Sequence, residues 1–218
     1  MSADAMARPC GLITDWGGVL TIPIAAAVAA WLNADGIDVL GYRSVVMRWV
    51  REAYGPDGPP NPVHALERGE ITPQQFERLL AGRLVRTDGD AVPPDGLLRR
   101  MFAEMVPVEP MYALLRSVRR AGVSTGLLSN SWGNDYPREV FSELFDAVVI
   151  SSEVGMRKPE EGIFLHALAR LGLAPHQCVF IDDIEANVTA ARALGMVGLH
   201  HRDPDGTAAA VMELFGLA

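Results

Sequence analysis

Five short apolar runs, separated by stretches with helical periodicity, constrain the fold of this 218-residue chain more than any other feature of its sequence. Each run is compact and rich in Val, Ile or Leu, as expected for parallel strands that are covered on both faces. Because strand-like and helical segments alternate, the sequence predicts an α/β fold with a doubly wound parallel sheet. The expected strands are residues 11–15, 124–128, 147–150, 178–181 and 197–200.

The stretch between the first two expected strands has a different pattern. Phe76, Leu79 and Leu80 illustrate its helical periodicity, and no convincing strand interrupts it. We therefore expect a mainly helical domain inserted directly after the first strand. The predicted division is an α/β core at 7–22 and 107–218, with a helical domain at 23–106.

Composition limits the partners of the chain. Hydrophobic residues make up 49% of it, which is enough for a substantial core. The formal net charge of -8 argues against binding along a DNA or RNA backbone, which needs clustered Lys and Arg. A small phosphorylated substrate stays open, because a bound cation can invert the local charge.

The sequence also suggests where the protein works. Its N-terminus lacks the pattern of a secretory signal, and the Ala-rich run at 24–32 is too short to span a bilayer. Cys10 and Cys178 cannot form a disulfide framework, and we interpret both as buried free thiols in a reducing compartment. We therefore expect a soluble, cytoplasmic protein without a membrane partner, either a monomer or a homodimer.

Polar side chains follow the expected strands. The first strand ends at Asp15, the second at Ser129 and Asn130, and the fourth at Asp182 and Asp183. In an open α/β sheet, ligands bind outside the carboxyl ends of the strands. We therefore expect these residues to meet at one edge of the sheet and to form the functional site.

Lys158 precedes a predicted helix and so lies on a loop at the same edge. The resulting set of carboxylates, a hydroxyl and an ammonium group suits phosphoryl transfer. A carboxylate can attack phosphorus to form an acyl-phosphate, and charge on the phosphoryl oxygens needs a cation and neutral donors nearby. Asp15, Asp182 and Asp183 supply the hard oxygen ligands that magnesium prefers. The sequence therefore predicts a Mg2+ cofactor.

At these residues the sequence resembles the haloacid dehalogenase-like hydrolases, and the resemblance covers nearly the whole chain. It implies a Rossmann-like core with a helical cap inserted after the first strand. The Asp-x-Gly-x-Val pattern at Asp15 resembles a sub-branch with sugar-phosphate phosphatases and the N-terminal domain of soluble epoxide hydrolase. The four motifs, in the family's order, are Asp15–Leu20, Leu128–Asn130, Arg157–Pro159 and Phe180–Asp183.

The resemblance assigns roles to individual residues. Asp15 would be the nucleophile and a metal ligand, with the carbonyl of Gly17 and the carboxylate of Asp183 as further ligands. Asp182 would act through a metal-bound water. The residues expected at the phosphoryl group are Ser129, Asn130 and Gly18, which would bind its oxygens, and Lys158, which would neutralise its charge.

Gly17 departs from the family's pattern. Most phosphatases of the family carry a second aspartate at this position, which protonates the leaving group and later activates water. Its absence removes general acid–base catalysis, which typically raises the rate by about 10²- to 10⁴-fold. We therefore expect substrates with good leaving groups, such as anomeric or acyl phosphates, or an acid supplied by the cap.

Two other interpretations of Gly17 stay open. Haloacid dehalogenases also lack the second aspartate, because a halide leaves without a proton, and a degenerate family member would bind phosphorylated ligands without turnover. Asp182 and Asp183 favour a phosphatase, since adjacent acids near Asp15 repel one another unless a cation lies among them.

Glu67, Arg68 and Glu70 in the expected cap are candidates for substrate contact or for a replacement acid. Taken singly, each of the three is expected to be a solvated residue at a helix end.

Overall fold

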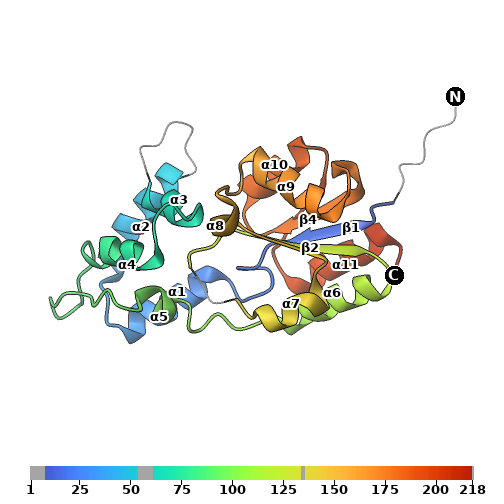
Figure 1. Ribbon diagram of the computed structural model, residues 1–218. Helices are drawn as coiled ribbons and strands as arrows, with labels where there is room; N and C mark the ends of the chain where they lie inside the picture. The colour runs from blue at the N-terminus through green and yellow to red at the C-terminus, as the bar shows by residue number, and fades with distance from the viewer. Residues whose placement is uncertain (1–7, 54–60, 134–135, 218) are drawn as a thin grey trace, which may run out of the picture.

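Five parallel strands form one sheet in the order β3-β2-β1-β4-β5, in a computed structural model that describes residues 8–53, 61–133 and 136–217 (Figure 1). The predicted α/β fold with a doubly wound parallel sheet is confirmed, and each strand ends within one residue of its expected position. Position 7, the expected start of the core, lies outside the described residues. The strands are β1 (Gly11–Thr14), β2 (Ser124–Ser129), β3 (Ala147–Ile150), β4 (Cys178–Asp182) and β5 (Val197–His200).

Helices cover both faces of the sheet. Successive strand residues point to opposite sides, and because both sides carry apolar side chains, both have to be buried. Leu12 of β1 packs in the hydrophobic cluster that contains α6 (Glu109–Arg120), α7 (Phe141–Leu144) and α11 (Pro204–Phe215). Its neighbour Ile13 packs in the opposite cluster with α9 (Glu161–Leu171) and α10 (Glu185–Ala193). The shorter helices of the core are α8 (Ser151–Val154) and the 3-10 turns η1 (Arg138–Val140) and η2 (Pro175–Gln177).

The insertion after β1 is helical and has its own hydrophobic cluster, built around residues such as Trp31, Phe76 and Leu80. Phe76, Leu79 and Leu80 lie on one helix, as their periodicity predicted, but Leu79 is 38% exposed. It lies one residue, or about 100°, from the buried Leu80 on its helix. The helices are α1 (Ile24–Ala34), α2 (Val39–Ala53), α3 (Pro62–Glu67), α4 (Pro73–Ala81) and α5 (Leu97–Met101).

Two neighbouring connections join the insertion to the core. The amide of Ile22 donates to the carbonyl of Val106 at 3.1 Å, and the amide of Val108 donates to the carbonyl of Leu20 at 2.9 Å. The chain therefore leaves and re-enters the core at one place. We propose that the part between these connections is a cap domain, and we use that name for it below.

The cap also touches the core beyond these connections, at the end of α3. Gly69 has a φ of 70°, and a Cβ atom there would lie 2.6 Å from the carbonyl oxygen of Ser152 in α8. A side chain is therefore excluded both by the left-handed backbone and by the core. This close approach fixes α3 above the carboxyl edge of the sheet.

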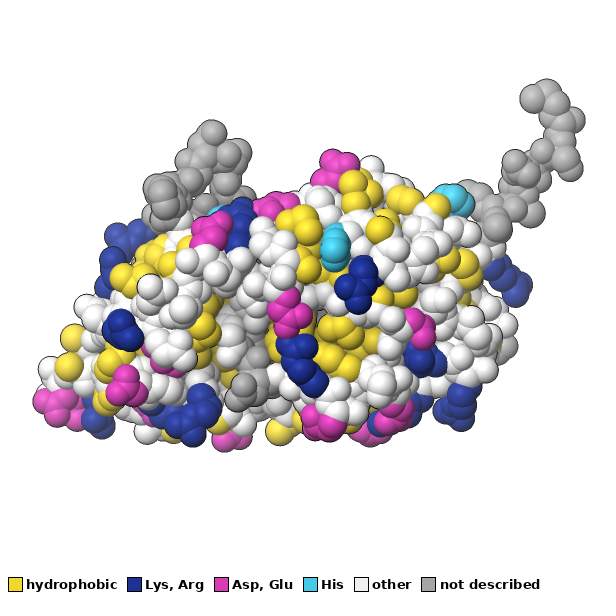
Figure 2. All heavy atoms as spheres, in the orientation of Figure 1, with side chains coloured by type: hydrophobic (Ala, Val, Ile, Leu, Met, Phe, Trp, Pro, Cys, Tyr) yellow, Lys and Arg dark blue, Asp and Glu magenta, His cyan; other side chains and the backbone are white. Residues whose placement is uncertain are grey.

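The two cysteines differ in their exposure to solvent. Cys178 is buried as expected, but Cys10 is exposed because it lies just before β1. Among the described residues, every helix is too short or too polar to cross a membrane. Lys and Arg side chains are interspersed with Asp and Glu on the face that Figure 2 shows.

Replacing Gly69 by Ala is expected to destabilise the protein by about 2–4 kcal/mol, which combines left-handed strain with overpacking against Ser152. The matched control is Gly89→Ala, because Gly89 has a φ of 90° and no atom within 4 Å of its added Cβ. It should cost about 1–2 kcal/mol from strain alone. Urea unfolding measures both values, and equal losses would contradict the proposed close contact.

Candidate active site

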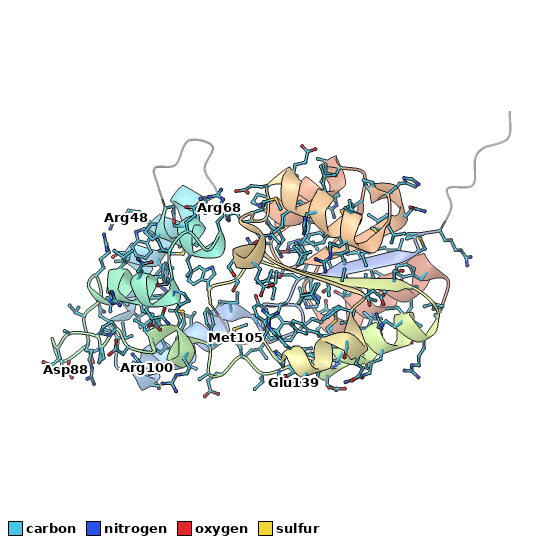
Figure 3. The ribbon with its side chains drawn as sticks, viewed as in Figure 1. Arg48, Arg68, Asp88, Arg100, Met105 and Glu139 are labelled. Atoms are coloured by element: carbon cyan, nitrogen blue, oxygen red, sulfur yellow. The ribbon has the colours of Figure 1, made fainter. Side chains whose placement is uncertain are left out.

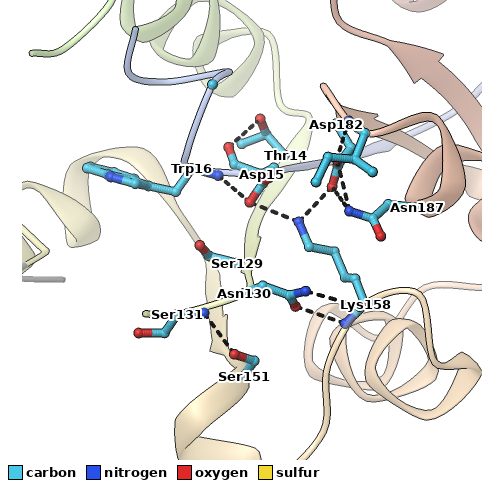
Figure 4. Close-up of polar contacts among 12 residues, drawn as sticks. Thr14, Asp15, Trp16, Ser129, Asn130, Ser131, Ser151, Lys158, Asp182 and Asn187 are labelled. Carbon is cyan, nitrogen blue, oxygen red and sulfur yellow. Dashed lines mark hydrogen bonds and ion pairs between the residues drawn. The ribbon is translucent and has the colours of Figure 1, made fainter. Parts of the chain in front are cut away.

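Three strands deliver carboxylates and a hydroxyl to one edge of the sheet (Figure 4). Asp15 follows β1, Ser129 ends β2, and Asp182 ends β4. Because all strands are parallel, their carboxyl ends lie at the same edge, as the sequence predicts. Lys158 reaches this edge from the loop before α9.

The ammonium group of Lys158 lies between two carboxylates. Its Nζ atom is 2.8 Å from Oδ1 of Asp15 and 2.6 Å from Oδ2 of Asp182, and the residue is 1% exposed. Burial lowers the pKa of Lys158, but the two carboxylates outweigh it, so this pKa is above its ordinary value. The side chain therefore carries a fixed positive charge against the sheet edge.

Asp15, Asp182 and Asp183 form an acidic cluster, with ligand oxygens within 4.8 Å of one another. Burial, together with the charges of Asp182 and Asp183, raises the pKa of Asp15 to about 7 against the lowering effect of Lys158. Burial and Asp182 raise the pKa of Asp183 to about 6. Three carboxylates facing one ammonium leave negative charge to be compensated, and their hard oxygens fit a divalent cation.

Asn187 orients the carboxylate of Asp182. Its Nδ2 donates to both carboxylate oxygens of Asp182, at 3.0 and 3.1 Å, and it is 1% exposed. The amide of Ile184 adds a 2.8 Å hydrogen bond to the same carboxylate. Asp15 is held in a similar way by the amide of Trp16, at 2.7 Å. Hydrogen bonds therefore fix the orientations of the Asp15 and Asp182 carboxylates.

Gly17 and Gly18 differ in what surrounds them. Gly18 has a φ of 77°, and an added Cβ would lie 2.3 Å from Oδ2 of Asp183, so glycine is needed for that carboxylate to approach. The Gly18 amide donates to Thr21 Oγ1 at 3.2 Å. A Cβ at Gly17 would instead meet Cδ1 of Ile24 at 3.1 Å. The metal role of Gly17 and the phosphate role of Gly18 stay predictions.

Ser129 and Asn130 each have a partner already. Ser129 Oγ is 2.9 Å from the hydroxyl of Tyr136, while Asn130 holds the backbone of Lys158 through hydrogen bonds of 2.8 and 3.0 Å. Asn130 thus fixes the loop that carries the ammonium group. The sequence did not indicate Tyr136 as a site residue, because it lies outside the motifs and no local pattern marks it.

A cavity of about 230 Å³ lies between this edge of the sheet and the cap. Its floor contains Asp15, Ser129, Lys158 and Asp183. Residues of α1, α2, α3 and α5 line the opposite side. A substrate that reaches the carboxylates is therefore enclosed partly by cap side chains.

Glu67 is one of these cap residues, and the expectation that it is a solvated helix end was wrong. It is 3% exposed, its Oε1 accepts from Nε1 of Trp132 at 3.0 Å, and its Oε2 pairs with Nε of Arg157. Arg68 pairs with Glu160 of the core, and the Glu70 side chain is 58% exposed. Of the three cap candidates, Glu67 lines the cavity.

The sequence at 11–195 matches the model of the haloacid dehalogenase-like hydrolases. The chain belongs to this family. The hydrolase is 32% identical to a sesquiterpene phosphatase of Aspergillus oryzae, over 69% of this chain and 77% of that protein. It is 28% identical to bifunctional epoxide hydrolase 2 of Rattus norvegicus, over 88% of this chain but 38% of that longer protein.

A solved structure supports the fold of the hydrolase. An enzyme of the same family from Bacteroides thetaiotaomicron, in complex with magnesium and inorganic phosphate, superposes with a TM-score of 0.63 at 24% identity. The match covers 89% of this chain and 94% of that one. At this level of identity the likeness concerns the arrangement of the strands and helices.

Replacing Glu67 by Gln is expected to destabilise the hydrolase by about 3–5 kcal/mol, because it replaces the carboxylate of a buried ion pair with Arg157 by a neutral amide. The matched control is Glu153→Gln, which breaks an exposed pair with Arg138 and should cost less than about 1 kcal/mol. Urea unfolding compares the two variants. A Glu67 variant as stable as the control would show that the buried pair contributes little.

Proposed function

We propose that the hydrolase is a magnesium-dependent phosphatase of small phosphorylated metabolites, with Asp15 as its transiently phosphorylated nucleophile. The observation that carries this proposal is the position of Lys158, whose ammonium group contacts Asp15 inside a cluster of three carboxylates. A nucleophilic carboxylate beside a fixed positive charge suits attack on a phosphoryl group, whose oxygens gather negative charge.

The acidic cluster is the proposed magnesium site. Asp15, Asp183 and the carbonyl of Gly17 would hold the ion directly, and Asp182 through a water molecule. The surplus of carboxylates over ammonium groups supports this assignment. Bound magnesium would keep Asp15 and Asp183 ionised despite their raised pKa values, and would neutralise charge on the phosphoryl oxygens.

The proposed reaction has two displacements at phosphorus. A carboxylate oxygen of Asp15 forms a bond to phosphorus while the bond from phosphorus to the leaving-group oxygen breaks. The leaving group takes up a proton from solvent. Water then attacks phosphorus and gives up a proton to solvent, the bond to Asp15 breaks, and inorganic phosphate leaves. Ser129 would donate to a phosphoryl oxygen and Lys158 would stabilise the charge that develops.

Relatives favour a phosphatase over the alternatives of a 2-haloacid dehalogenase or a non-catalytic binding protein. The sesquiterpene phosphatase is similar over most of its own length. Anomeric sugar phosphates and acyl phosphates are the substrates that Gly17 leads us to expect, because both have better leaving groups than a simple alkyl phosphate has.

Replacing Asp15 by Asn should lower phosphate release from an aryl phosphate by about a thousandfold or more, because the amide is not a nucleophile. Removing magnesium with a chelator should abolish turnover of the unmodified protein. Release of inorganic phosphate measures both effects. The control is Asp205→Asn, which changes an exposed aspartate of α11 and should leave turnover unchanged.

Three other outcomes would contradict the proposal. Turnover of 2-haloacids that survives chelation would indicate a dehalogenase. Binding of phosphorylated ligands without any turnover would indicate a non-catalytic protein. Full activity of the Asp15 variant would require another nucleophile.

Replacing Gly17 by Asp should raise turnover of alkyl phosphates by about tenfold or more, because it restores a proton donor to the leaving group. The new side chain would point toward Ile24, which also lines the cavity. Gly17→Asn is the matched control, since it has the same shape without an acid. A gain in both variants, or equally fast hydrolysis of alkyl and aryl phosphates by the unmodified protein, would contradict the expected role of Gly17.

A further inference from the structure

The cap side of the catalytic cavity differs in chemistry from its floor. We define the roof as the cap residues that line this cavity. The floor is dominated by carboxylates, an ammonium group and a hydroxyl, whereas hydrocarbon makes up most of the roof. Six of the roof residues are Ile24, Val28, Val46, Val63, Met101 and Met105.

The roof offers few polar side-chain atoms to a ligand in the cavity. Glu67 and Tyr42 are the roof residues with polar side-chain atoms among those described. Both carboxylate oxygens of Glu67 are already engaged, by Trp132 and by Arg157. A sugar placed here would bury several hydroxyl groups with few partners, and unpaired buried hydroxyls are costly.

We propose that the substrate's leaving group is apolar, so that the hydrolase acts on phosphate esters or anhydrides of hydrocarbon-rich groups rather than on sugar phosphates. This inference rests on the proposed phosphatase function and specifies its substrate class. The phosphoryl group would lie at Asp15 and Lys158, and the leaving group would replace water against the roof. Burial of its apolar surface supplies the binding free energy.

A second cavity, of about 590 Å³, adjoins the catalytic one. Phe102 and Met105 line both cavities, so these two side chains lie between them. Met105 sits between the cap helices and the core, as Figure 3 shows. An apolar tail would fill the smaller cavity first and would then meet this pair of side chains. Binding should therefore improve with tail length and then level off.

The test uses phenyl phosphates with para-alkyl tails from methyl to hexyl, because their leaving groups have nearly the same basicity. We expect kcat/KM to rise about threefold for each added methylene until the cavity is full. Para-propylphenyl phosphate should exceed its isostere with a terminal hydroxyl, para-(hydroxyethyl)phenyl phosphate, by about tenfold. Glucose 1-phosphate and glucose 6-phosphate should be poorer substrates than any tailed phenyl phosphate.

Ile24→Ser tests the roof directly. Ile24 is 42% exposed at the start of α1, so the polar substitution should leave the fold intact. It should lower the ratio of kcat/KM for the hexyl compound to that for phenyl phosphate by about tenfold. The matched control is Leu40→Ser, at a 75% exposed residue that does not line the cavity, and it should leave the ratio unchanged.

The outcomes separate this inference from the phosphatase proposal. Rising kcat/KM with tail length, with a loss of that dependence in Ile24→Ser, supports the apolar leaving group. Hydrolysis of phenyl phosphate without any dependence on tail length, or a preference for the sugar phosphates, overturns it and leaves the phosphatase proposal intact. Absence of phosphate release from every compound overturns the phosphatase proposal and this inference with it.

Discussion

The contact of one buried ammonium group with two carboxylates is the interaction on which the site depends. Lys158 joins Asp15, after β1, to Asp182, at the end of β4, and so ties a loop to two adjacent strands. Without that positive charge the pKa of Asp15 would be higher still, and a protonated Asp15 is a poor nucleophile and a poor metal ligand. Asn130 and Asn187 contribute indirectly, since one holds the backbone of Lys158 and the other holds Asp182.

The sequence predicted the fold and the residues at the sheet edge for the same reason. A parallel strand buried on both faces is a continuous apolar run, and the run ends where the chain meets the ligand side of the sheet. Asp15, Ser129 and Asp182 therefore stand next to the runs that locate them. Lys158 needed more than periodicity, because a loop lysine is usually solvated, and its family motif supplied the missing information.

Contacts between the cap and the core could not be predicted in this way. Glu67 ends α3 like an ordinary solvated acid, and its burial arises from Trp132 and Arg157, which are 65 and 90 residues away along the chain. Tyr136 reaches Ser129 through a loop without periodicity. Local patterns describe which face of a helix is apolar, and they do not say which charged residue of another domain will lie against its end.

Gly17 and the apolar roof of the cavity restrict the leaving group of the substrate in the same way. An aspartate at this position, which the resemblance leads us to expect in most phosphatases of the family, would deliver a proton to the leaving group, and its carboxylate would need polar surroundings to stay ionised in the next step. Here the space that a side chain would enter is lined by Ile24 and Met105. Hydrocarbon beside that position would raise the pKa of an acid and would solvate an apolar leaving group well. The lost aspartate and the apolar cap thus favour the same kind of substrate, one whose leaving group departs with little help from a proton and binds through its hydrocarbon.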